Sequence, residues 1–304
     1  MHNSNYSINP NLILSQDNSF LDIPRDELYS KLCVLSILHE VYTTPKPGLV
    51  DRNNNGSHLD LDISLFEKSA FSLENYFLDM YNLGISYSSS SGKEDNVYCQ
   101  KMRDRAIFAE KEMYKVTNNT NTHKGVIYIF GVFSFVLGKF NNTVPSLDEI
   151  LKEMSRFGTY SLNDDLYSNV EFDSPGYKQF IKYGLTGIRG EVANGLISVT
   201  KYSLPLFKNM KQNDNIQDIG KFALINLLGN VDDSCMIHRG GYELSLKIKE
   251  KIQKDLKQGI IDEEYIYNLD KEFIKLNLSP GGCADLLSIT YLIKFCEDQN
   301  YLVI

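Results

Sequence analysis

The chain has 304 residues, of which 42% are hydrophobic and 23% are charged, and this composition is typical of a globular protein with a substantial core. Its formal net charge of −8 argues against a sequence-independent nucleic-acid binder, which needs a basic surface to displace counterions. The most apolar segment, 126–137, is too short to cross a bilayer, so we expect no membrane partner. Five cysteines without a C-x-x-C pair favour reduced thiols in the cytoplasm.

The first residues, 1–24, are rich in Asn and Ser and lack the pattern of a secretory signal, so we expect a flexible leader before a single catalytic domain at 25–304. Apolar residues at helical spacing predict helices over 26–41, 62–80 with Gly84 as C-terminal cap, 95–116, 126–137, 146–157, 191–210, 216–228, 241–257, 262–276 and 284–297. The polar segment 163–176 is expected to be a loop.

Strand signals are weak throughout the sequence. No segment alternates cleanly between turn residues, and neither the G-x-G-x-x-G nor the G-x-x-x-x-G-K-[ST] motif is present. The predicted fold is therefore all-α, a single globular domain of about ten helices. We expect its Gly-rich motif loops to gather at one cleft.

Five short segments combine glycine with charged residues, and each precedes or opens a predicted helix. They are 44–62, 122–125, 186–191, 232–241 and 279–285. A helix N-terminus offers unpaired N–H groups and a partial positive charge, and glycine admits a ligand to the backbone, so such segments suit phosphates. The predicted substrate-binding residues are Lys46, Gly48, Arg52, His58, Thr122, Lys124, Gly125, Arg189, Gly190, Arg239, Gly240, Gly241, Ser279, Gly281 and Gly282.

The cations in these segments are the strongest signal. Pro45 and Pro47 restrict the backbone on both sides of Lys46, which predicts a stiff, extended presentation of its ammonium group. Any one of these cations alone is better explained as a helix cap or a surface ion pair. Four together favour phosphate binding, and they are Lys46, Lys124, Arg189 and Arg239.

The carboxylates allow two roles, as ligands of Mg²⁺ or as groups that act on a hydroxyl or a sugar cation. Capping explains Asp62 and Asp285 equally well, because both precede predicted helices, whereas Asp51 and Asp233 fit capping less well. No histidine spacing indicates zinc. His123 is the best candidate for donating a proton to a phosphate or leaving group.

The motifs also resemble a known family. The segment Thr44-Pro-Lys-Pro-Gly-Leu-Val-Asp-Arg52 with Gly56 and His58, together with 121–125, 184–191, 239–241 and 277–287, is similar to the triphosphoribosyl-dephospho-CoA synthase family. The resemblance implies an all-α enzyme that converts ATP and 3′-dephospho-CoA into 2′-(5″-triphosphoribosyl)-3′-dephospho-CoA and adenine. The product would pass to the enzyme that loads the acyl carrier protein of citrate lyase or, in a close relative, of malonate decarboxylase. One departure is Cys235, where the family tends to have Asn.

On this resemblance, the four cations hold the phosphates of the two nucleotides, and Mg²⁺ is bound by Asp60, Asp62 or Asp233. Asp51 or Asp233 orients the acceptor 2′-hydroxyl, and His123 or Glu191 assists the departure of adenine. Two other functions remain open, an ATP-dependent phosphotransferase or nucleotidyltransferase acting on another small molecule and a nucleotide-binding regulator without catalysis. The oligomeric state and the number of metal ions are open as well.

Overall fold

The computed structural model describes residues 23–90, 94–166 and 175–304. Helices α1 to α14 and one π-helical segment build this part of the chain, and the described residues contain no strand beyond an isolated parallel bridge between Ser146 and Val303. The all-α prediction is confirmed, with more helices than the ten or so expected. Residues 1–22 lie outside the described residues, so the division into leader and domain stays a prediction.

The helices of the first half are α1 (Arg25–Tyr42), α2 (Ile63–Ser72), α3 (Glu74–Ser89), α4 (Asp95–Val116), α5 (Lys124–Lys139), α6 (Leu147–Leu166) and α7 (Pro175–Tyr183). The second half contains α8 (Gly187–Ala193), the π-helical segment Val199–Ser203, α9 (Leu204–Lys208), α10 (Ile216–Leu228), α11 (Ser234–Gly240), α12 (Tyr242–Gln258), α13 (Glu263–Lys275) and α14 (Gly281–Asp298). No helix in the described ranges is long and apolar enough to cross a membrane.

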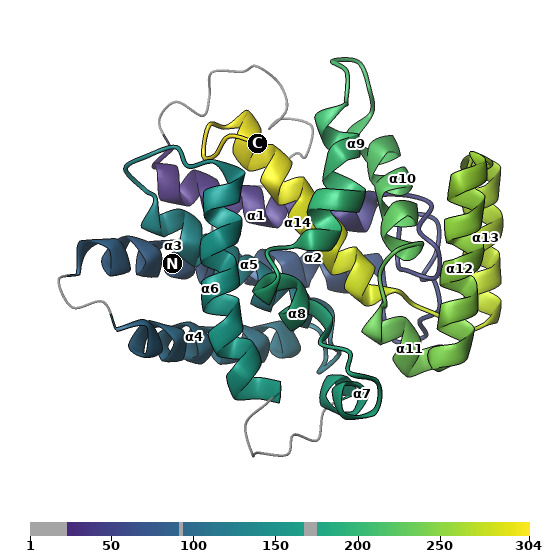
Figure 1. Cartoon of the computed structure of the whole chain (residues 1–304), viewed down its shortest axis with the longest axis horizontal. Coiled ribbons are helices and arrows are strands. Elements are labelled where there is room, and N and C mark those ends of the chain that lie inside the picture. Colours follow the sequence, from purple (N-terminus) through teal and green to yellow (C-terminus); the bar gives the residue numbers. More distant parts are fainter. Residues whose placement is uncertain (1–22, 91–93, 167–174) are drawn as a thin grey trace.

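The core lies where α5 and α14 pass through the middle of the molecule, with α3 packed on α5 and α1 packed on α14 (Figure 1). Helix α5 buries almost every side chain between Val126 and Leu137, as the apolar sequence predicts. The approach of α3 to α5 is very close, because a Cβ atom on Gly84 would lie 2.0 Å from the carbonyl oxygen of Phe135. Gly84 is therefore a helix-contact residue, and its prediction as a C-terminal cap is wrong.

Two predicted helices are divided in the structure. The helix expected over 62–80 becomes α2 and α3, which meet at Leu73, and Asp62 caps α2 by accepting a hydrogen bond from the Leu65 N–H at 2.9 Å. The helix expected over 191–210 is interrupted because Gly195 and Leu196 both have a positive φ. The expected loop 163–176 is helical as far as Leu166, and 167–174 lie outside the described residues.

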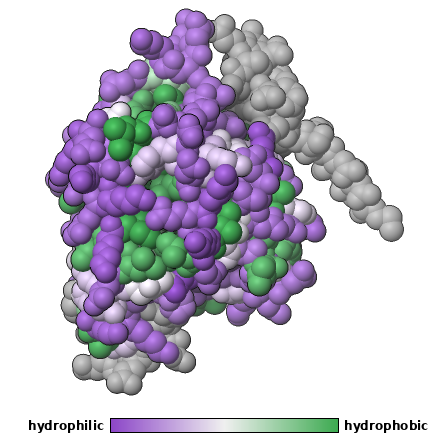
Figure 2. Space-filling model, turned by 90° about the vertical axis from the view of Figure 1, so that its right-hand side faces the viewer, coloured by the Kyte–Doolittle hydropathy of each residue, from purple (hydrophilic) through white to green (hydrophobic). Residues whose placement is uncertain are grey.

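Four motif segments are partly helical, since 122–125 contributes its last two residues to α5. Residues 187–191 lie in α8, residues 234–240 form α11, and residues 281–285 open α14. A seven-residue helix is too short to show an apolar period, and glycine in such a segment is easily read as a turn. The face that carries α12 and α13 is mostly hydrophilic, with apolar groups exposed in separate places (Figure 2).

Candidate active site

The first motif loop is organised around Asp51. Its buried carboxylate accepts hydrogen bonds from the N–H groups of Lys46 at 2.9 Å, Asn53 at 2.7 Å and Asn54 at 3.1 Å. Burial raises the pKa of Asp51, and the three N–H donors oppose that rise. Asp51 does not cap a helix, as predicted, and its oxygens hold the loop in shape.

Lys46 points into the protein from this loop. Its side chain is only 2% exposed, and its ammonium group pairs with the carboxylate of Glu40, near the end of α1. Burial raises the pKa of Glu40, while the charge of Lys46 acts in the opposite direction. The stiff loop therefore directs Lys46 toward a carboxylate of its own chain, and sequence reasoning had not assigned Glu40 to the site.

Arg239 joins three motif segments. Its guanidinium donates to the Ser57 carbonyl oxygen at 2.8 Å, to the Asn277 side-chain oxygen at 3.1 Å and to His58 Nδ1 at 3.0 Å. Since an arginine only donates, His58 Nδ1 accepts and the neutral ring donates from Nε2 to Ser279 Oγ at 2.8 Å. Burial and the charge of Arg239 lower the pKa of His58 to about 4, which keeps the ring neutral.

Asp233 joins two helix N-termini. One oxygen accepts from the Met236 N–H at 2.8 Å and caps α11, and the other accepts from the Cys283 N–H at 2.7 Å in the first turn of α14. The residue is 2% exposed, and burial raises its pKa. The prediction that Asp233 fits capping poorly is wrong, because the start of α11 was not visible in the sequence.

Asp285 lies near the start of α14, faces the first turn of α5 and makes no capping bond. It is the fifth residue of α14, and its carboxylate oxygen Oδ2 would lie 1.8 Å from a Cβ atom on Gly125, in the first turn of α5. Desolvation raises the pKa of Asp285 well above its ordinary value, and the charges of Glu40 and Asp233 add to the rise. The residue nevertheless keeps an intermediate exposure to solvent.

His123 belongs to a buried chain of hydroxyl groups. Thr122 Oγ1 donates to Ser69 Oγ at 2.7 Å, and Ser69 Oγ contacts His123 Nδ1 at 2.7 Å. The tautomer of the ring decides which of the two atoms donates, because a hydroxyl oxygen that accepts from Thr122 can accept a second hydrogen bond. His123 Nε2 has no hydrogen-bond partner among the described residues. Burial, with the charge of Lys46, lowers the pKa of His123 to about 3.

Four other predicted residues already make contacts in the structure. The Lys124 ammonium pairs with Glu110 at 3.0 Å, and Glu191 accepts from Ser198 Oγ at 2.5 Å. Arg189 lies over the ring of Tyr128 and Arg52 over the ring of Tyr42, at 5.4 and 4.1 Å from the ring centroids.

The carboxylates predicted to bind Mg²⁺ do not form a metal site of their own. Asp62 caps α2, both oxygens of Asp233 accept from backbone N–H groups, and Asp60 is exposed. Within the described ranges, no group of three or more His, Cys, Asp or Glu side chains is arranged to hold a metal ion. These residues therefore do not fit a metal ion held by the protein alone.

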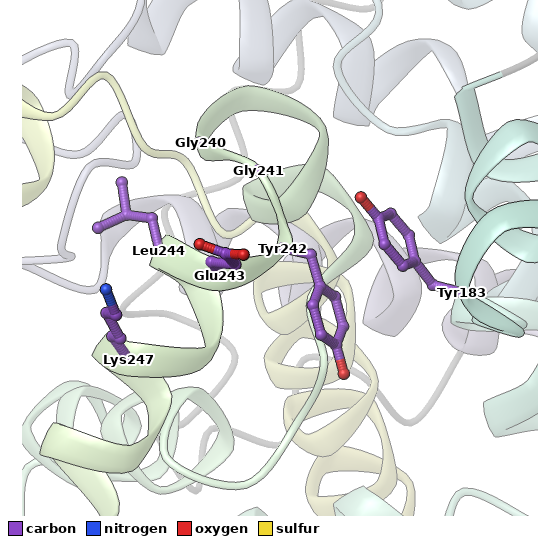
Figure 3. Close-up of a pocket in the computed structure, with 7 residues that line it drawn as sticks. All are labelled: Tyr183, Gly240, Gly241, Tyr242, Glu243, Leu244 and Lys247. Atoms are coloured by element: carbon purple, nitrogen blue, oxygen red, sulfur yellow. The ribbon is translucent and has the colours of Figure 1, made fainter.

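A cavity of about 520 Å³ lies at the junction of α11 and α12. It is lined by Tyr183, Gly240, Gly241, Tyr242, Glu243, Leu244 and Lys247 (Figure 3). The rings of Tyr183 and Tyr242 stack at a centroid distance of 4.7 Å and an interplanar angle of 13°. Gly241 has φ 82° and ψ 163°, which favours glycine, and no atom would meet a Cβ there within 4 Å.

The structure thus brings four of the five segments into direct contact through Arg239, Asp233 and Asp285, and the fifth lies beside α11, where a Cβ on Gly187 would be 3.5 Å from Ser234 Oγ. Whether the segments share a single cleft stays a prediction. All five cysteines are free, as predicted.

Comparison with known proteins gives the same family as the motifs. A model of the family described as CitG, ATP:dephospho-CoA triphosphoribosyl transferase, matches residues 26–302. A protein of Streptococcus mutans named probable 2-(5''-triphosphoribosyl)-3'-dephosphocoenzyme-A synthase is 33% identical over 290 residues, which cover 88% of this chain and 96% of the relative. No solved structure matches the chain.

Two further relatives agree. The 2-(5''-triphosphoribosyl)-3'-dephosphocoenzyme-A synthase of Escherichia fergusonii is 32% identical over 272 residues, with 85% of this chain and 88% of the relative covered. A probable enzyme of the same name from Photobacterium profundum is 32% identical over 302 residues, with 95% of each chain covered. Together with the helical fold, these matches define an all-α enzyme of the transferase class.

The particular family is equally clear. The chain belongs to the ATP:dephospho-CoA triphosphoribosyl transferase family, because the family model spans nearly its whole length and relatives above 30% identity cover most of it. The resemblance predicted from the motif segments is confirmed.

Proposed function

We propose that this chain transfers the 5-triphosphoribosyl group of ATP to the 2′-hydroxyl of 3′-dephospho-CoA and releases adenine. The family match supports this reaction. The observation that supports a site for this reaction is that the motif segments meet through Arg239, Asp233 and Asp285. Cations, helix N-termini and an unpaired carboxylate therefore lie in one region.

The triphosphate of ATP remains intact in this reaction, so the site has to hold phosphates without cleaving them. Lys124, Arg189, Arg239 and Arg52 are the cations proposed to make these contacts, helped by glycine backbone at Gly240 and Gly281. Bidentate guanidinium groups and backbone N–H donors suit phosphate oxygens. Lys46, Asp51 and Asp233 are proposed to have a structural role. They hold the loops that carry the phosphate-binding residues.

One nucleotide is proposed to lie along α11. The cavity at Gly240 and Gly241 has a volume in the range of small-molecule sites, and its stacked tyrosines offer an aromatic face to a base. Helix α11 has seven residues and is therefore about 10 Å long. A nucleotide in the cavity can thus extend its ribose or phosphates toward the carboxylates at the other end of the helix.

Mg²⁺ is proposed as an ion that ATP carries on its triphosphate. The chain lacks a group of three metal-binding side chains in its described part, so the protein would complete the coordination with few ligands of its own. A cytoplasmic location is proposed as well, in keeping with five free thiols.

The test is to incubate the protein with ATP, Mg²⁺ and 3′-dephospho-CoA and to separate the products by chromatography. The expected result is adenine and a triphosphoribosylated product in equal amounts, with activity lost in EDTA and restored by added Mg²⁺. ADP, AMP or pyrophosphate without adenine would indicate a phosphotransferase or nucleotidyltransferase. Saturable ATP binding without any product would indicate a regulator.

The product is proposed to pass to the enzyme that loads the acyl carrier protein of citrate lyase, with malonate decarboxylase as the alternative destination. The genes beside the one that encodes this chain distinguish the two, since either set of subunits would be encoded there. A transfer assay with both purified carrier proteins gives the same answer directly. Loading of only the malonate decarboxylase carrier would contradict the proposed destination.

A further inference from the structure

We propose that Asp285 is the general acid of this enzyme and protonates the base that leaves from C1′ of ATP. This inference rests on the proposed function, because it assigns a role in the reaction in which adenine departs. Asp285 is not among the residues that the sequence selected as catalytic, and the structure distinguishes it from every carboxylate that was.

The first observation is that Asp285 has no partner. No hydrogen bond or ion pair engages its carboxylate in the described structure, whereas the neighbouring acidic residues are all engaged. Those engaged residues are Glu40 with Lys46, Asp51 with three N–H groups, Asp233 with two N–H groups, Asp270 with Gly48 and Asn54, and Glu191 with Ser198. An unengaged carboxylate among protein groups is costly and calls for an explanation. A contact with the substrate supplies one.

The second observation is the space kept for this side chain. Gly125 lies opposite Asp285, and an added Cβ would be 1.8 Å from Oδ2 and 2.7 Å from Cγ. Glycine in the first turn of α5 leaves the backbone bare at the place where the carboxylate sits. The residue also keeps an intermediate exposure, so a ligand can reach it, whereas Asp233 is 2% exposed and Glu40 is 4% exposed.

The third observation is electrostatic. Glu40 from α1 and Asp233 from the start of α11 are the charges that act on Asp285, and the cation Lys46 is already paired with Glu40. Desolvation and these two negative charges raise the pKa of Asp285 well above its ordinary value. A raised pKa lets a carboxyl group hold its proton to higher pH, and a general acid needs a proton to give.

The proton balance of the step is complete without a further reactant. The C1′–N9 bond of ATP breaks and its electron pair goes to the base, while the Asp285 proton is transferred to a ring nitrogen so that adenine leaves neutral. The 2′-oxygen of 3′-dephospho-CoA forms the new bond to C1′ and loses its proton. That proton restores the Asp285 carboxyl by way of solvent, so the enzyme is unchanged at the end of the cycle.

The decisive variant is Asp285→Asn, which keeps the shape of the side chain and removes the acid. With ATP, we expect adenine release to fall by roughly 10² to 10⁴. The dissociation constants of ATP and 3′-dephospho-CoA should stay within about threefold, since the uncharged variant still occupies the same space. The matched control is Asp298→Asn on the same helix, whose carboxylate pairs with Lys294 at 2.7 Å and which should leave the rate unchanged.

A second substrate separates acid catalysis from a structural role. In 7-methyl-ATP the base already carries a positive charge and leaves without being protonated. The ratio of the Asp285→Asn rate to the wild-type rate should therefore rise from about 10⁻² to 10⁻⁴ with ATP toward 1 with 7-methyl-ATP, after subtraction of the uncatalysed loss of base. A merely structural residue would slow both substrates equally.

The wild-type enzyme gives an independent reading that does not depend on the variant folding. Its rate with ATP should fall as the pH rises through the raised pKa of the acid, and its rate with 7-methyl-ATP should not show that decline. If Asp285→Asn slowed the reactions of both substrates equally, or was as active as the wild type, the role of Asp285 would be overturned and the proposed function would stand. A wild-type enzyme that releases no adenine would overturn the proposed function and this role together.

Discussion

Asp233 offers the sharpest test of how the site is held together. Replacing it by alanine removes the cap of α11, which is worth about 1 kcal/mol, and leaves the buried N–H of Cys283 without its acceptor, which costs about 1–3 kcal/mol. We therefore expect Asp233→Ala to lower the free energy of unfolding by about 2–4 kcal/mol. Asp233→Ser keeps a capping oxygen too short to reach Cys283, so about 1 kcal/mol of the loss should return.

The assay is urea unfolding of the protein without substrates, followed by circular dichroism. Asp262→Ala is the matched control, because Asp262 caps α13 through a single bond from the Tyr265 N–H at 2.8 Å and is exposed. It should cost only about 1 kcal/mol. Equal losses in the two alanine variants would refute the bridge between α11 and α14. A stable Asp233→Ala variant whose adenine release falls 10³-fold would instead place Asp233 in the chemistry.

Three further predictions concern the close packing at Gly125, the protonation of His39 and the contacts of Arg239. Gly125→Ala should displace the Asp285 carboxylate and lower the rate of adenine release by at least tenfold. The control is Gly176→Ala in α7, which should leave the rate unchanged because no atom lies within 4 Å of the added Cβ. Equal rates in the two variants would contradict the close contact between Gly125 and Asp285. His39 is buried between aromatic rings, and neither ring nitrogen has a hydrogen-bond partner among the described residues. Burial lowers its pKa from 6.5 to about 4. Between these two pH values the unfolded state binds a proton that the folded state does not, so the stability of the wild-type protein falls as the pH falls. His39→Phe should therefore gain about 2 kcal/mol relative to wild type between pH 7.5 and pH 5 in urea unfolding, and a pH-independent difference would refute this. Arg239→Lys keeps the charge but loses the fork that contacts the first loop, so we expect KM for ATP to rise at least tenfold in steady-state assays, with an unchanged KM as the contrary result.

The helices that the sequence predicts best are those with a long and regular apolar period. The segment 95–116 was predicted with the bounds that the structure has, and 216–228 likewise. Errors occur where a residue serves a distant partner. Gly84 resembles a helix cap in the sequence, and only the crossing of α3 over α5 explains its missing side chain. Such a crossing depends on contacts between residues far apart in the chain.

The site residues show the same division. The sequence predicts site segments from their concentration of glycine, proline and charge, and the structure brings these segments together, but the sequence does not tell which charges are used within the protein. Lys46 was expected to face a phosphate and instead pairs with Glu40. Asp233 was expected to act on substrate and instead accepts two backbone N–H groups. Cys283 lies fifty residues from Asp233 and on another helix, so their bond leaves no local pattern. Glu40 and Lys46 are only six residues apart, but they meet through the path of the loop between them, which the sequence does not specify.

This division also explains why a site rich in carboxylates can serve a reaction of polyphosphates. Carboxylates repel phosphates unless a partner offsets their charge. Glu40 is paired with a cation, and Asp51 and Asp233 accept hydrogen bonds from backbone N–H groups. Burial raises the pKa of Asp285, which has no hydrogen bond or ion pair in the described structure, and the charges of Glu40 and Asp233 add to the rise. In its protonated form Asp285 carries no charge, and that form neither repels the triphosphate nor needs a cation. The structural carboxylates thereby make the site tolerant of phosphates and supply its acid in the same arrangement.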